Sequence, residues 1–164
     1  MAMTESSLTI LHRTWDVEDD TPHILDFQKG YPGHVEFDFT KIWKGLKKFR
    51  KEAAIGLHFI HVHPQGYGIQ MSDTDVNCLE GFMCGFGISP LFSIIEFTDD
   101  KLGYKQSTYE IGPDYAGDKE FAIMTLTDSA KPEIPIWGVD ILWNLATQKY
   151  FPLNYKPKEI TDGT

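Results

Sequence analysis

The chain has 164 residues, of which 41% are hydrophobic and 13% aromatic, so it is long enough to bury a core without disulfide bonds. Its 24 acidic side chains against 15 basic ones give a formal charge of −9. An acidic surface argues against a nucleic-acid partner, because binding a phosphate backbone requires basic groups. It suits a basic protein partner or simply solubility. We expect one domain over residues 1–152 and a mobile polar tail over 153–164.

The cysteines and the N-terminus bear on the cellular compartment. Cys78 and Cys84 lie six apart in one predicted helix, a spacing that favours neither a Cys-x-x-Cys site nor a disulfide. The first residues lack the basic-then-apolar pattern of a signal peptide. No apolar run approaches the roughly 20 residues that span a bilayer. We therefore expect a cytoplasmic protein that binds no membrane.

The first 62 residues predict three strands, a helix and a further strand. Alternating apolar and polar residues predict strands at 7–17, 23–28 and 35–39. A helix over 40–53 follows, with Thr40 as its N-cap and basic side chains along a solvated face. Residues 54–62 are apolar on both faces, which is typical of a central strand covered on both sides.

The remainder of the chain predicts two helices and three strands. One helix opens at Ser72 and ends before Ser89-Pro90. Apolar, β-branched runs predict strands at 91–97, 106–111 and 121–126. A connector over 128–136 leads to a C-terminal helix over 139–151. This order of elements predicts the α/β (α+β) class, with a mixed β-sheet flanked by helices.

The segment from His61 to Asp75 carries the candidate chemistry. His61 and His63 stand two apart at the end of an apolar strand, so their side chains point to one face, roughly 6.5–7 Å apart. The loop that follows can return the carboxylate of Asp75 to the same point. Two neutral imidazoles and one carboxylate are a reasonable zinc shell.

Each half of this segment also has a purely structural explanation. The histidines can form a polar pair at a strand end. Ser72 and Asp75 also have the spacing of a capping box, in which Ser72 caps a helix and Asp75 returns the bond. The combination of both halves with the intervening proline favours metal binding.

Residues 61–75 resemble the JAMM motif of the JAB1/MPN metallopeptidase family, which reads His-x-His-Pro, a short loop and Ser-x-x-Asp. The matching residues are His61, His63, Pro64, Ser72 and Asp75. The loop also carries Gly-Tyr-Gly at 66–68, as in the deubiquitinases of the proteasome lid and the signalosome. Because the loop is one residue longer than is usual in the family, Asp73 stays open as an alternative ligand.

The resemblance implies an MPN/JAMM-like sheet with cytidine-deaminase-like layering, and Zn²⁺ held by His61, His63 and Asp75. It also implies hydrolysis of a peptide or isopeptide bond in a protein or peptide substrate, such as a ubiquitin-like conjugate. Ser72 would stabilise the oxygen of the tetrahedral intermediate.

The general base of the family is a glutamate on the first strand. It corresponds by topology to Glu5, and Glu36 and Glu18 are the other candidates. Three hypotheses follow from these residues: a zinc-dependent peptidase or isopeptidase, an inactive MPN-like binding or assembly module that retains the metal shell, and a globular protein without metal.

Overall fold

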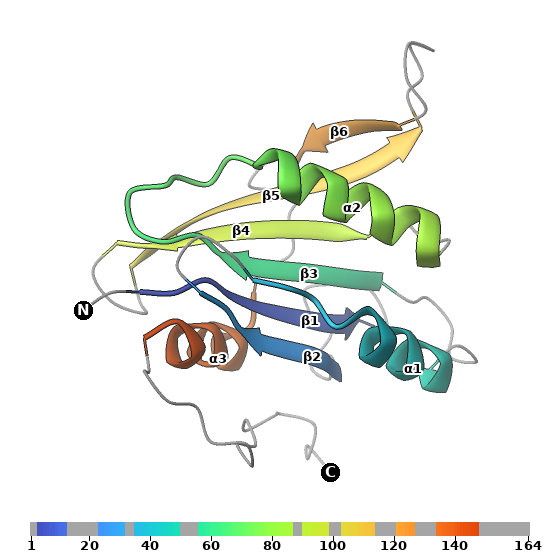
Figure 1. The fold of residues 1–164 in the computed structure, drawn as a ribbon, viewed down its shortest axis with the longest axis horizontal. Helices are drawn as coiled ribbons and strands as arrows, with labels where there is room; N and C mark the ends of the chain where they lie inside the picture. Colours follow the sequence, from blue (N-terminus) through green and yellow to red (C-terminus); the bar gives the residue numbers. More distant parts are fainter. Residues whose placement is uncertain are drawn as a thin grey trace.

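The computed structural model describes residues 3–12, 23–31, 35–49, 56–86, 90–98, 103–113, 121–126 and 134–147. Within them, six strands form one sheet in the order β2-β1-β3-β4-β5-β6 (Figure 1). The strands are β1 (Ser6–His12), β2 (His23–Lys29), β3 (Gly56–Val62), β4 (Leu91–Phe97), β5 (Tyr104–Pro113) and β6 (Phe121–Thr125). Strands β3 and β4 run parallel, and the other neighbouring pairs are antiparallel. The predicted mixed sheet is confirmed.

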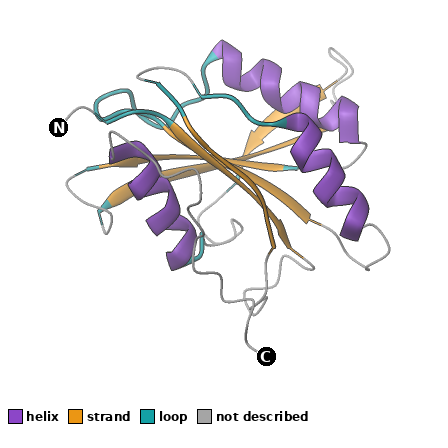
Figure 2. Cartoon of the chain, turned by 60° about the horizontal axis from the view of Figure 1, so that its bottom comes forward, coloured by secondary structure: helices purple, strands orange, loops and turns teal. Residues whose placement is uncertain are grey.

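Helices cover both faces of this twisted sheet (Figure 2). The described part of the chain has three of them, α1 (Phe39–Phe49), α2 (Asp73–Phe86) and α3 (Ile136–Thr147). Helix α3 packs on one face, and α1 and α2 pack on the other. Each face therefore buries its own hydrophobic cluster, and the sheet separates the two.

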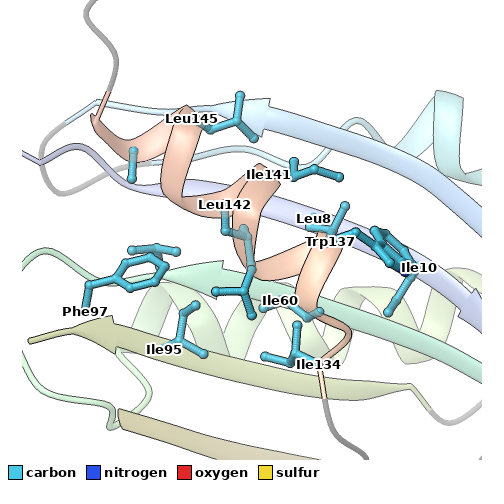
Figure 3. Packing of buried hydrophobic residues seen from close by; sticks show 13 residues of the cluster. Leu8, Ile10, Ile60, Ile95, Phe97, Ile134, Trp137, Ile141, Leu142 and Leu145 are labelled. Carbon is cyan, nitrogen blue, oxygen red and sulfur yellow. The ribbon is translucent and has the colours of Figure 1, made fainter. Parts of the chain in front are cut away.

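The face under α3 is packed with aliphatic and aromatic side chains (Figure 3). Seven of the 12 residues of α3 are buried, which explains why this helix has so few polar positions. Leu142 and Leu145 are at most 1% exposed and pack over Leu8, Ile60 and Ile95 of the central strands. Burying each such side chain contributes roughly 1.5–3 kcal/mol to folding.

Strand β3 lies in the middle of the sheet. It pairs with β1 on one side and β4 on the other, and all seven of its residues are buried. The prediction of a central, doubly covered strand is confirmed. Residues that alternate along β3 face opposite clusters: Ile60 and Val62 face α3, whereas Leu57 and Phe59 face α1 and α2.

The predicted strand at 35–39 is wrong. Residues 35–38 form no ladder, and Phe39 is the first residue of α1. The cause is the side chain of Asp38, whose Oδ1 accepts the backbone N–H of Lys41 at 3.0 Å and so caps the helix. The predicted N-cap at Thr40 is wrong for the same reason, since Thr40 already lies inside the helix.

The C-terminal helix begins three residues earlier than predicted. Ile136 is its first residue, and the carbonyl of Pro135 accepts the backbone N–H groups of Gly138 and Val139 at 2.9 and 3.1 Å. The predicted tail at 153–164 lies outside the described residues. Among the residues that the structure does describe, no helix has both the length and the apolar character needed to cross a membrane.

Candidate metal centre

Two histidines, His61 and His63, lie at the C-terminal end of the central strand β3. His61 and His63 continue the row of Leu57 and Phe59, so both rings emerge on the face of α1 and α2. The backbone N–H of His63 donates to the carbonyl of Ile95 at 2.9 Å, which extends the pairing with β4 past the end of the strand. Both histidines are buried, and their ring centroids are 4.6 Å apart.

The first turn of α2 supplies the carboxylate. The backbone N–H of Asp75 donates to Oγ of Ser72 at 3.1 Å, and the N–H of Ser72 donates back to Oδ2 of Asp75 at 3.0 Å. This is the capping box that the sequence indicated. It also holds Asp75 buried beneath the histidines, whereas Asp73 is exposed. The same hydrogen bonds between Ser72 and Asp75 therefore cap the helix and hold Asp75 beside the two histidines.

Asp75 contacts both histidines, through a different carboxylate oxygen in each case. Nε2 of His61 is 3.2 Å from Oδ1 of Asp75, and Nε2 of His63 is 3.1 Å from Oδ2 of Asp75. Two ligands of a tetrahedral zinc ion, with bonds of about 2.0–2.1 Å, lie about 3.3 Å apart. Nε2 of His61 is fully buried and makes no hydrogen bond, although Asp75 is within ion-pair distance. A metal ion would satisfy this nitrogen.

Glu5 joins the group from the neighbouring strand. Ser7 of β1 pairs with His61 in antiparallel register, so two residues further along the same face Glu5 comes opposite His63. Its carboxylate is buried, and Oε1 lies 3.4 Å from Nδ1 of His61. One ligand atom from each of Glu5, His61 and His63 lies within 4.8 Å of the other two, so these three side chains could hold a metal ion.

Of the other two candidate glutamates, Glu36 has an exposed side chain, and Glu18 lies outside the described residues. Contacts on both sides of Glu5 hold it in place. Its N–H donates to the carbonyl of Tyr31, and the N–H of Thr4 donates to the carbonyl of Ala146 in α3, at 3.1 and 2.9 Å.

Charge within the group favours a cation. Burial alone would raise the pKa of Asp75, but the imidazoles of His61 and His63 and the N–H of Ser72 hold it well below its usual range. Burial would likewise lower the pKa of His63, but the contacts with Asp75 and with the carbonyl of Gly68 outweigh it and raise the pKa. The carboxylate of Asp75 therefore stays ionised, and its contacts favour a positive charge at His63, which either a proton or a metal ion could supply.

Cys78 lies one turn along α2 from Asp75. Burial and the nearby charge of Asp75 raise the pKa of its thiol to about 12 in the metal-free protein. The group of described residues that could hold a metal ion, Glu5, His61 and His63, offers nitrogen and oxygen donors.

The centre opens into a cleft of about 390 Å³. Its lining combines the acidic and imidazole groups with polar and apolar side chains, namely Glu5, Val35, His61, His63, Pro64, Tyr67, Gln70, Met71, Ser72, Thr74 and Asp75. Tyr67, at the tip of the loop after β3, is 73% exposed. This exposed ring lines the same cleft as the two histidines.

The loop between His63 and Ser72 is held by a residue that the sequence motif does not contain. Oε2 of Glu96, on β4, accepts the backbone N–H groups of Gly66 and Gly68 at 2.7 and 3.1 Å. Glu96 is buried, and it is the only charged residue in the apolar run of β4. An acid inside an otherwise apolar strand is the signal that could have identified it.

Comparison with models of known protein families gives no match for this sequence, and comparison with curated proteins gives none either.

Proposed function

We propose that the protein is a zinc-dependent metallopeptidase or isopeptidase of the JAMM type. The observation that carries the proposal is the convergence of His61, His63 and Asp75 within 3.2 Å contacts at the end of a central strand, with Glu5 beside them. A mixed sheet with helices on both faces is compatible with MPN layering.

The donor set supports zinc as the metal. Two imidazoles and one carboxylate are a ligand set of catalytic zinc sites, whereas magnesium and calcium prefer oxygen ligands alone. Zinc bound here would lower the pKa of a bound water to about 7 and would polarise a substrate carbonyl.

The remaining roles fall to the protein's own side chains. We assign Glu5 as the general base that accepts a proton from the attacking water and passes it to the leaving amine. The hydroxyl of Ser72 accepts from Asp75 N–H, so its hydrogen remains available to donate to the oxygen of the tetrahedral intermediate. The substrate would be a protein or peptide, including ubiquitin-like or other isopeptide-linked chains, lying in the cleft beside Tyr67.

One contact favours a second candidate, an MPN-like binding or assembly module that keeps the metal shell but does not cut. Glu5 approaches Nδ1 of His61, the ring nitrogen opposite the one that faces Asp75. A carboxylate at that nitrogen is the arrangement in which an outer residue orients a metal-binding histidine rather than activating water.

Metal analysis and cleavage assays together test the proposal. We expect about one zinc per chain by mass spectrometry of the purified protein, and chelator-sensitive cleavage of at least one member of a panel of short peptides and isopeptide-linked conjugates. Zinc without cleavage of any member would support the binding module. Absence of zinc after incubation at neutral pH would contradict both candidates.

A further inference from the structure

A buried acid on β4 faces the loop that follows the histidines. Glu96 is 6% exposed and lies on the same face of β4 as Phe92 and Ile94, beneath the Gly-Tyr-Gly turn. A buried carboxylate is costly unless it is hydrogen-bonded. Here one oxygen, Oε2, accepts two backbone N–H groups, those of Gly66 and Gly68.

These bonds stabilise an unusual backbone. Gly66 and Gly68 have φ angles of 91° and 75°, a region that L-residues with side chains rarely adopt. Hydrogen bonds to an ionised acceptor are roughly twice as strong as neutral ones. Glu96 therefore holds the middle of the loop, while the hydroxyl of Tyr109 holds its later part by donating to the carbonyl of Ile69 at 2.7 Å.

The same loop contacts a candidate metal ligand. The carbonyl oxygen of Gly68 lies 3.0 Å from Nδ1 of His63. A carbonyl oxygen can only accept, so Nδ1 must carry the hydrogen. In the neutral ring, this leaves the lone pair on Nε2, which is the nitrogen directed at Asp75.

We propose that Glu96 is a positioning residue that acts through Gly68 to fix the tautomer and orientation of His63. The inference rests on the proposed zinc site, since the purpose of the arrangement is to present Nε2 to the metal. Outer contacts of this kind typically change metal affinity about 10–100-fold.

The test compares three variants of the full-length protein. Glu96→Ala removes the acceptor, Glu96→Gln keeps a neutral one, and Ser93→Ala removes a buried hydroxyl on the opposite face of the same strand as a matched control. Zinc affinity is measured by competition with a chromogenic chelator. Loop order is followed by amide exchange at Gly66 and Gly68. The tautomer of His63 is read from ¹⁵N shifts of its ring in metal-free protein at about pH 9, where imidazoles are neutral.

We expect Glu96→Ala to lose about 10–100-fold in zinc affinity, to exchange both glycine amides faster and to lose the pure Nδ1–H tautomer. Glu96→Gln, which keeps only a neutral acceptor, should lie between wild type and Glu96→Ala in zinc affinity and in glycine amide exchange, and Ser93→Ala should keep all three properties. If Glu96→Ala does not fold, Glu96→Gln decides: faster exchange with weaker zinc binding supports the role, and wild-type values for both contradict it.

Two outcomes separate this inference from the proposed function. Wild-type protein that binds no zinc contradicts the proposed function, and the tautomer of His63 in Glu96→Ala then decides the positioning role alone. Wild-type zinc affinity and an unchanged tautomer in a folded Glu96→Ala variant overturn the inference while leaving the proposed function standing.

Discussion

The two faces of β3 both bury histidines, but their surroundings differ in kind. On the face of α3, Nε2 of His58 lies 2.6 Å from Oγ of Ser93, which lies 2.7 Å from Oγ1 of Thr108. On the other face, His61 and His63 lie within 3.4 Å of carboxylate oxygens. The first group sits within the sheet and is fully buried, and the second opens into the cleft.

Burial alone does not distinguish the candidate metal ligands from other histidines of this chain. Complete burial, together with the neighbouring His12, lowers the pKa of His58 to about 3, so this ring is neutral. It takes part in a hydrogen-bonded chain with the hydroxyl groups of Ser93 and Thr108. Carboxylates reverse the effect of burial at His63 and raise its pKa. The same residue type is therefore a core polar group on one face of β3 and a candidate metal ligand on the other.

The largest expected effect is on zinc binding. His63→Ala should abolish measurable zinc, because it removes one of the three proposed ligands. It should leave the far-ultraviolet circular dichroism unchanged, since the sheet core does not depend on this side chain. His58→Gln is the matched control and should retain about one zinc per chain. Loss of zinc in both variants, with both still folded, would break the distinction between the two faces.

Turnover of the proposed reaction should respond next most strongly, at Glu5. If Glu5 is the base, Glu5→Gln keeps zinc and lowers turnover by about 10²–10⁴-fold, because an amide cannot accept the proton. If Glu5 instead orients His61 through Nδ1, zinc affinity falls by about 10–100-fold. Measuring zinc affinity and turnover on the same samples distinguishes the two roles.

The pH dependence of stability should differ in sign between the faces. The pKa of His58 is lower in the folded protein than in the unfolded protein, so the unfolded protein takes up the proton first as the pH falls. The free energy of unfolding should therefore decrease as the pH falls from about 6.5 towards 3. His63, with a raised pKa, contributes stability at acid pH in metal-free protein and loses it as pH rises through its folded pKa.

Urea denaturation of metal-free protein at pH 7 and pH 4 measures this difference. The contribution of His58 to the free energy of unfolding should be lower at pH 4 than at pH 7 by on the order of 2–3 kcal/mol. His58→Gln should show a flatter pH profile over the same range. An equally steep profile in that variant would assign the acid sensitivity to other groups.

The parts of the candidate site differ in how far the sequence could predict them. Alternation and apolar runs predicted β3 and β4, and the short spacing of His61, His63 and Asp75 predicted their convergence, because a strand and a capped helix fix those positions locally. Glu96 acts through the β3–β4 register, which no local spacing encodes. At 35–39, alternation over five residues was outweighed by the cap at Asp38.

The smallest expected effects concern two serines, one on each face. Ser72→Ala removes an exposed N-cap and should lower the free energy of unfolding of metal-free protein by about 1 kcal/mol. Ser93→Ala removes a fully buried hydroxyl that His58 and Thr108 both contact, so it should cost more, about 1–3 kcal/mol. Ser72→Thr keeps the cap and should stay close to wild type. Urea midpoints at pH 7 give the order, and a cost at Ser72 that exceeds the cost at Ser93 would mean that the capping box stabilises the fold more than the buried network does.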